Sequence, residues 1–193
     1  MRPINGRTRR AVLLRMTPLL VYRIQKRKHL DTALTGEGAR RTGGRWNPVD
    51  VPLIYASTSP ELAFLETFVH LDGTPLADLP PFVLLTLELP ADAVETVAII
   101  NLPPGWDQRP YPDATAQFLR PRLGPHDPAL AFAVPSVILP GSPTRNVLIN
   151  PLHSRLAEVR LVATVPLAFD ERLRPAPGIP PIFPAPKRQP RKS

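Results

Sequence analysis

The segment GEGARRTGGRWN, residues 36–47, combines four glycines with three arginines and ends in a tryptophan and an asparagine. Glycine permits backbone shapes that other residues avoid, and an arginine guanidinium matches two oxygens of a phosphate group at once. Neither familiar phosphate motif is complete, because Arg41 stands where a dinucleotide fingerprint needs its third glycine and no glycine-lysine-Ser/Thr sequence follows. The composition therefore fits a pyrophosphate-binding loop and a solvated loop equally well.

Four further residues carry chemistry, although none is distinctive alone. Arg23 lies in the apolar sequence VYRI, where a charged side chain needs a partner or a pocket. Tyr55 lies in LIYAS, and Glu66 lies on the element that follows. Ser136 comes after a proline in an apolar run, where a hydrogen-bonded core serine is the ordinary explanation. For each residue taken singly, an ordinary structural role explains its presence.

The element that carries Glu66 has the clearest helix signals in the chain. Ser59 is a suitable N-cap, Pro60 suits the first helical position, and ELAFLETFVHL follows. At 100° per residue the apolar residues form one arc that consists of Leu62, Phe64, Leu65, Phe68, Val69 and Leu71. Glu66 falls just beyond the edge of this arc, where a carboxylate can be half buried and point into a cleft.

Strand-like sequence accounts for much of the remaining chain. The pattern predicts strands at 20–24, 53–57, 82–89, 95–102, 130–139, 146–150 and 159–169. PADA is the expected turn between the third and fourth of these, a short helix is expected from Asp113 to Leu119, and Asn146 and Asn150 are typical of turns. Two helices among six or seven strands, without regular βαβ alternation, predict a single-domain α+β fold with a mixed or antiparallel sheet. A doubly wound nucleotide-binding fold is excluded.

The positive charge of the protein belongs to its two ends. The formal net charge is +8 and the isoelectric point is near 10.7. Residues 1–20 and 174–193 each carry five basic residues and no acid, whereas residues 21–173 carry 14 basic and 16 acidic residues. The predicted organisation is thus a basic N-terminal extension (1–20), a nearly neutral folded body (21–173) and a proline-rich basic tail (174–193).

Composition also restricts the class of protein. There is no cysteine for a disulfide or a thiolate nucleophile, and no apolar run has the length of a membrane-spanning helix. The histidines show no metal-ligand spacing; they are His29, His70, His126 and His153. We therefore expect a cytoplasmic protein without a metal. The basic ends leave one remote alternative, a nucleic-acid-binding module, although no helix-turn-helix or RNA-binding signature accompanies them.

Seven landmarks follow one another in a distinctive order: YRI, GEGARRTGGRWN, IYAS, LAFLE, VPS, NVLINPLH and FDERL. This order resembles the RES domain family, which is named after an arginine, a glutamate and a serine. The resemblance runs from about Tyr22 to Leu173. It implies an ADP-ribosyltransferase-like fold, NAD+ as substrate, and a role as the toxin of a bacterial toxin–antitoxin pair with a cognate antitoxin as partner.

The resemblance also implies site residues, because it places Arg23, Arg45, Tyr55, Glu66 and Ser136 around one NAD+ pocket. Glu66 would be the catalytic carboxylate, and Arg23 and Arg45 would bind the pyrophosphate. Tyr55 would pack on nicotinamide or its ribose. Arg45, Tyr55 and Ser136 are expected to serve both catalysis and NAD+ binding.

The expected activity is cleavage of the nicotinamide–ribose bond of NAD+, with transfer of ADP-ribose to water or phosphate and depletion of NAD+. The alternative is a mono-ADP-ribosyltransferase toxin that modifies a specific cellular protein. The site residues serve the first half of both reactions and do not separate them. Neither a membrane nor a specific nucleic acid is an expected partner.

Overall fold

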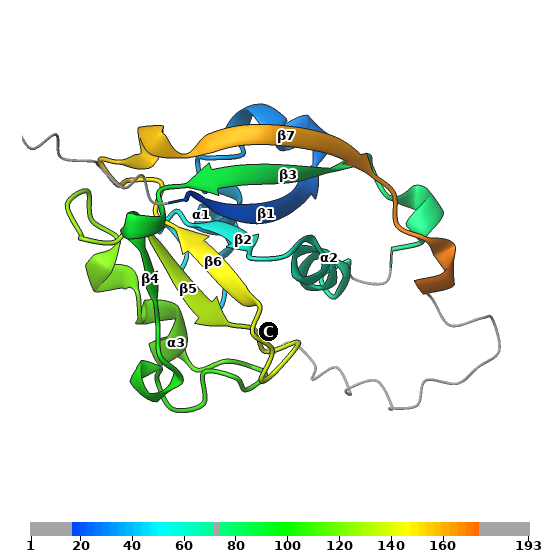
Figure 1. The fold of residues 1–193 in the computed structure, drawn as a ribbon. Coiled ribbons are helices and arrows are strands. Elements are labelled where there is room, and N and C mark those ends of the chain that lie inside the picture. The colour runs from blue at the N-terminus through cyan, green and yellow to red at the C-terminus, as the bar shows by residue number, and fades with distance from the viewer. Residues whose placement is uncertain (1–16, 72–73, 174–193) are drawn as a thin grey trace, which may run out of the picture.

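The computed structural model describes residues 17–71 and 74–173. The predicted basic tail, and all but the last residues of the predicted N-terminal extension, lie outside the described residues. Seven strands in the described part form one mixed sheet in the order β4-β5-β6-β2-β1-β3-β7 (Figure 1). The strands are β1 (Leu19–Lys26), β2 (Ile54–Ser57), β3 (Phe82–Leu89), β4 (Val94–Thr96), β5 (Ala131–Pro135), β6 (Arg145–Ile149) and β7 (Arg160–Leu167). Among these seven strands of the described residues, β4 and β5 pair in parallel and every other pair is antiparallel.

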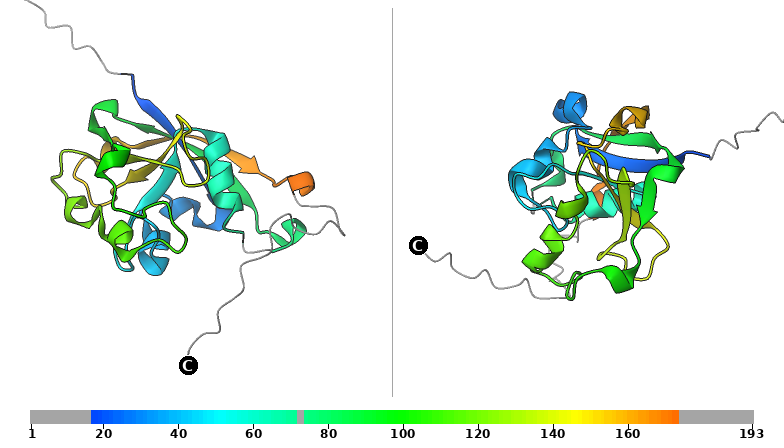
Figure 2. Two further views of the ribbon diagram at one scale, coloured as in Figure 1. Left: turned by 90° about the horizontal axis from the view of Figure 1, so that it is seen from below. Right: turned by 90° about the vertical axis from the view of Figure 1, so that its left-hand side faces the viewer.

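The helices are short. The α-helices are α1 (Glu37–Thr42), α2 (Pro60–Phe68) and α3 (Asp113–Gln117). Short 3-10 segments are η1 (Arg27–Thr32), η2 (Leu76–Asp78), η3 (Ala91–Ala93), η4 (Ile99–Asn101), η5 (Arg120–Arg122), η6 (Leu156–Glu158) and η7 (Glu171–Leu173). The strand β7 and the helix α3 lie at opposite sides of the molecule (Figure 1 and the right-hand view of Figure 2). No helix in residues 17–71 and 74–173 is long and apolar enough to cross a membrane. These elements confirm the predicted α+β class with few helices.

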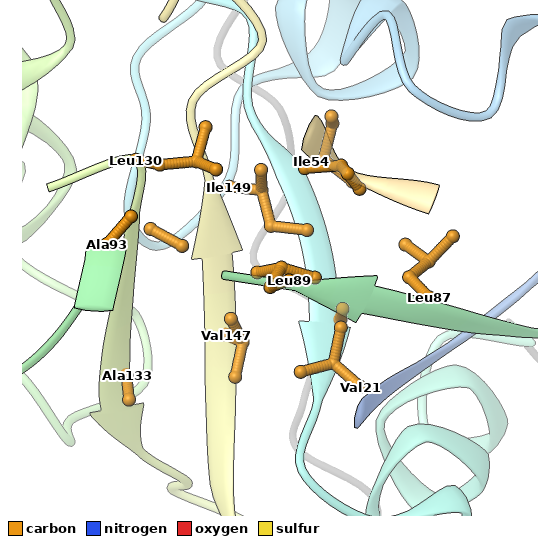
Figure 3. Packing of buried hydrophobic residues seen from close by; sticks show 12 residues of the cluster. Val21, Ile54, Leu87, Leu89, Ala93, Leu130, Ala133, Val147 and Ile149 are labelled. Atoms are coloured by element: carbon orange, nitrogen blue, oxygen red, sulfur yellow. The ribbon is translucent and has the colours of Figure 1, made fainter. Parts of the chain in front are cut away.

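The sheet is split near its middle. Between β1 and β2 the register contains a single pair, Tyr22 with Ser57, whereas β1 pairs with β3 along its whole length from Leu19 to Lys26. The half that contains β3 crosses the half that contains β2 and β6 (Figure 3). Apolar side chains fill the space between the halves; they include Val21, Leu87, Leu89, Ile54, Val147 and Ile149. Burial of this shared core holds the halves together, although few ladder hydrogen bonds join them.

A second core covers the other face of β2, β5 and β6. Successive side chains of a strand point to opposite faces, so Phe132, Val134 and Leu148 alternate with residues of the first core. They pack against Trp46, Leu53, Leu102, Leu119 and Leu123. The segment between β4 and β5, which includes α3, is therefore fixed on the face that carries Tyr55.

The predicted helix after Ser59 is confirmed, since α2 begins at Pro60 and Ser59 accepts a hydrogen bond from the amide of Leu62. Its apolar arc is only partly correct. Leu62 is buried as expected, but Val69 is 42% exposed because the helix ends at Phe68. The buried side of α2 is centred on Leu62 and Ala63, which brings Glu66 closer to the sheet than the predicted arc did.

The predicted strand 95–102 is wrong. Only Val94–Thr96 forms β4, and Ile99–Asn101 forms the turn η4. Ile100 is 90% exposed, so its apolar side chain joins neither core. The two prolines that follow Leu102 lack backbone donors and limit further pairing. The predicted strand 130–139 is also shorter in the structure, where β5 ends at Pro135.

Candidate active site at the split of the sheet

A cavity of about 710 Å³ lies beside the single pair that joins β1 to β2. Its volume falls within the range of about 300–1,000 Å³ that is typical of small-molecule sites. Four of the predicted site residues line it, namely Arg23, Arg45, Tyr55 and Glu66. Ser136 is buried behind the lining and reaches the cavity only through Glu66. The structure thus brings together residues from β1, β2, α2 and the segment after α1.

Two hydrogen-bond donors hold the carboxylate of Glu66. Its Oε1 accepts from Ser136 Oγ at 2.9 Å and from Asn146 Nδ2 at 2.5 Å. The amide of Asn146 is itself oriented, because its Oδ1 accepts from Ser57 Oγ at 2.9 Å. Glu66 Oε2 has no hydrogen-bond partner within the described residues, and the side chain lines the cavity. A fixed carboxylate therefore presents one oxygen to a ligand.

The serine in this arrangement is fixed by main-chain donors. Ser136 lies one residue after the end of β5, and its Oγ accepts from the amides of Ile138 at 3.0 Å and Leu139 at 3.4 Å. Its hydroxyl proton is directed to Glu66 as a result. Ser136 is placed to orient Glu66 rather than to touch a ligand.

Arg23 bridges the split between the two halves of the sheet. Its Nη1 donates to the carbonyl oxygen of Tyr55 at 2.6 Å, and its Nε donates to Gln25 Oε1 at 3.1 Å. A side chain of β1 thus satisfies a backbone group of β2 where ladder pairing has stopped. Burial lowers the pKa of Arg23 to about 10, which leaves the guanidinium charged at neutral pH.

Tyr55 joins β2 to the glycine-rich segment. Its hydroxyl donates to Asn47 Oδ1 at 2.7 Å and accepts from the amide of Trp46 at 3.1 Å. Burial raises the pKa of Tyr55, so the hydroxyl stays protonated. A Cβ atom on Gly44 would lie 2.6 Å from the Tyr55 hydroxyl oxygen, which explains why a glycine stands there. The tyrosine ring lines the cavity.

GEGARRTGGRWN is not one open loop, because part of it forms α1. Arg40 and Arg41 both pair with Glu37 on this helix, each with a closest distance of 2.7 Å. Of the three arginines in the segment, only Arg45 lines the cavity. Its Nη1 donates to the carbonyl oxygens of Trp106 and Gln108, at 2.5 and 3.0 Å.

The predicted site does not include two polar lining residues that bear on its chemistry, Asn146 and Arg109. The turn role that the sequence favours for Asn146 is wrong, because Asn146 lies inside β6 and its side chain donates to Glu66. Arg109 lies in the sequence QRPYPD, which carries no recognisable motif. With Arg109 the lining contains three arginines, Arg23 being the third, and Glu66 is its one acidic residue within the described part of the chain. Such a lining suits a ligand whose anionic part lies near the arginines while another part lies beside the negative charge of Glu66.

The residues that line the cavity do not resemble a metal site. Within residues 17–71 and 74–173, no group of three or more histidines, cysteines and carboxylates is placed to hold a metal ion.

Comparisons with known proteins agree with the fold and with the family resemblance of the sequence. The "Toxin Res" protein of Photorhabdus laumondii is 30% identical over 156 residues, which cover 80% of this chain and 97% of the relative. The "Prs ADP-ribosylating toxin" of Sphingobium sp. is 37% identical over 145 residues, which cover 72% of this chain and 86% of the relative. A chain in the crystal structure of the M. tuberculosis MbcT–MbcA toxin–antitoxin complex superposes with a TM-score of 0.56. It is 22% identical, and the match covers 78% of this chain and 85% of that one. A family model described as "RES domain" matches residues 20–170, and the chain belongs to the RES domain family.

Proposed function

We propose that this RES domain protein cleaves the bond between nicotinamide and ribose in NAD+. The observation that carries the proposal is the carboxylate of Glu66, which two side chains hold in place while its second oxygen remains available at an arginine-lined cavity. NAD+ combines the two features that such a site complements. It has an anionic pyrophosphate, and its ribose becomes positively charged when nicotinamide leaves.

The bond breaks when its electron pair moves to the ring nitrogen, which releases neutral nicotinamide and leaves an oxocarbenium-like ribose. A carboxylate fixed beside the ribose stabilises this charge, and a preorganised group of this kind contributes roughly 3–4 kcal/mol. Glu66 would supply the charge or accept a hydrogen bond from a ribose hydroxyl. Ser136 and Asn146 would keep the carboxylate from turning away.

The other lining residues would bind and orient the dinucleotide. The guanidinium groups of Arg23 and Arg45 line the cavity and would attract the pyrophosphate. Tyr55 offers an aromatic ring for nicotinamide or its ribose. Because each of these side chains is already hydrogen-bonded within the protein, ligand binding requires little further ordering.

The acceptor that we favour is water or inorganic phosphate, whose oxygen attacks the ribose carbon and gives free ADP-ribose or its phosphate ester. The second candidate is a protein side chain as acceptor. It is supported by the relative from Sphingobium sp., whose name describes an ADP-ribosylating toxin.

We also propose that the protein acts as the toxin of a toxin–antitoxin pair and is held by a cognate antitoxin. Support comes from relatives named "Toxin Res" and from the structural neighbour, which is part of a toxin–antitoxin complex.

Product analysis tests the acceptor. The purified protein is incubated with NAD+ in buffer, with inorganic phosphate and with a protein extract of cells, and products are identified by mass spectrometry. Free ADP-ribose or its phosphate ester in the first two reactions supports the favoured acceptors. If nicotinamide is released only with the extract, and one protein gains ADP-ribose, the acceptor is a protein.

A further inference from the structure

Residues 109–111 form one wall of the cavity, and Arg45 anchors the segment 106–111 that contains them. The guanidinium of Arg45 donates from Nη1 to the carbonyl oxygens of Trp106 and Gln108. Its central carbon also lies 5.0 Å from the ring centroid of Tyr111, a cation–π contact. Contacts before and after Arg109 therefore fix the backbone that carries it.

Arg109 differs from the other two arginines of the cavity. Arg23 and Arg45 donate to carbonyl oxygens of the protein, whereas Arg109 makes no hydrogen bond or salt bridge within residues 17–71 and 74–173. Arg109 is an exposed residue of the cavity lining, and its guanidinium has no acceptor within the described protein, on a backbone that Arg45 holds in position. A guanidinium presented in this way can bind an anion without first breaking a contact.

The charges of Arg45 and Arg109 oppose each other. The pKa of Arg45 is lowered, first by burial and then by repulsion from Arg109. Two neighbouring positive charges that repel each other are stabilised together when an anion binds between them. The two arginines are thus placed to share one anionic group.

We infer that Arg109 and Arg45 form a clamp for one phosphate group, in which Arg109 supplies free donors and Arg45 fixes the wall that carries it. The inference rests on the proposed function in one respect: the phosphate group is then part of the NAD+ pyrophosphate. Inorganic phosphate has the same chemistry and is the other source of the group.

Binding of uncleavable probes tests the clamp. ADP-ribose carries the pyrophosphate and no nicotinamide, adenosine carries neither phosphate, and inorganic phosphate stands alone. Arg109→Ala should weaken ADP-ribose binding about tenfold to hundredfold, the loss for hydrogen bonds to a charged group, and leave adenosine binding unchanged. The ADP-ribose affinity of Arg109→Lys should lie between those of the wild type and Arg109→Ala, because lysine keeps the charge but cannot donate two parallel hydrogen bonds.

The matched control is Arg120→Ala, which removes an exposed arginine that does not line the cavity. It should bind ADP-ribose like the wild type. Thermal unfolding of Arg109→Ala should match that of the wild type, since the side chain lacks protein partners in the described structure.

Each outcome bears on the clamp. If inorganic phosphate protects the wild type but not Arg109→Ala from unfolding, while ADP-ribose affinity is equal in both, the clamp exists and takes free phosphate. Equal affinity of wild type and Arg109→Ala for both probes overturns the inference, as does a wild type that binds neither. Nicotinamide release by the wild type is measured separately, so a functional clamp in a protein that does not cleave NAD+ would count against the proposed function alone.

Discussion

At the scale of single residues, the candidate site depends on side chains that fix other side chains. Glu66 receives hydrogen bonds from Ser136 and Asn146, and Asn146 is in turn fixed by Ser57. A charged group that is already oriented toward the reacting atoms stabilises the transition state more than a group that must reorient during the reaction. Residues that touch no ligand should therefore still control the rate.

The pH dependence of the rate of Asn146→Asp tests whether Asn146 affects catalysis through Glu66. The change keeps the size of the side chain but places a second carboxylate against Glu66. Two carboxylates in contact share a proton, which they lose only above a raised apparent pKa. Because catalysis needs Glu66 charged, the rate of nicotinamide release by Asn146→Asp should be low at neutral pH and rise as the pH increases. A variant whose pH profile coincides with that of the wild type would show that Asn146 does not act on Glu66.

Arg45→Lys tests how Arg45 acts. An ammonium group can still donate to the carbonyl oxygens of Trp106 and Gln108, but it cannot grip a phosphate with two parallel bonds. We expect about tenfold weaker binding of ADP-ribose by calorimetry. Arg41→Lys is the control, since Arg41 pairs with Glu37 and does not line the cavity. Unchanged affinity in Arg45→Lys would reduce the role of Arg45 to that of a point charge.

At the scale of elements, sequence patterns located the strands and the helix that carry the site. Alternating apolar residues predicted β3 with its observed limits, and the signals at Ser59 and Pro60 predicted the start of α2. Periodicity failed where a short turn or a short helix interrupts the pattern. The turn at Ile99–Asn101 and the helix α1 inside a glycine-rich segment are the main examples.

The site itself was predictable only in part, and for a related reason. Arg23, Tyr55 and Glu66 lie on elements with clear patterns, but only the resemblance to the RES domain family predicted that they surround one pocket. Arg109 lies in a segment without regular structure, and contacts with residues distant in sequence hold that segment at the cavity, namely those of Arg45 and the packing of Trp106 on Trp46. The partnership of Asn146 with Glu66 likewise depends on how α2 packs against β6.

Gly44 and Gly38 test the packing of the glycine-rich segment. A Cβ on Gly44 would meet the Tyr55 hydroxyl, which Asn47 and Trp46 hold in place, so Gly44→Ala should destabilise the protein by about 1–3 kcal/mol. Gly38 has no neighbouring heavy atom within 4 Å of such a Cβ and lies inside α1. Gly38→Ala should therefore keep or raise stability. Denaturant unfolding measures both, and equal stability of the two variants would contradict the described contact.

At the scale of the whole molecule, the family match to residues 20–170 and the near-neutral charge of residues 21–173 support one catalytic body between two accessory ends. We propose that this division is functional. The basic ends would account for any affinity for nucleic acid, because the body has no excess of positive charge.

A shortened chain of residues 18–174 tests this division. It should fold, consume NAD+ at close to the rate of the full chain, and lose salt-dependent binding to nucleic acid. Circular dichroism serves as the control for folding. A shortened chain that is folded and binds ADP-ribose but releases no nicotinamide from NAD+ would place a catalytic element in the ends.

The most direct test uses chromatography to measure how fast the purified protein and its Glu66→Gln variant release nicotinamide from NAD+. The wild type should release nicotinamide. Glu66→Gln should fold and bind ADP-ribose normally while its rate falls about a hundredfold or more, the loss for one preorganised electrostatic group. No release by the folded wild type in buffer, with phosphate or with cell extract would contradict the proposed activity, and a near-normal rate in Glu66→Gln would contradict the assigned site.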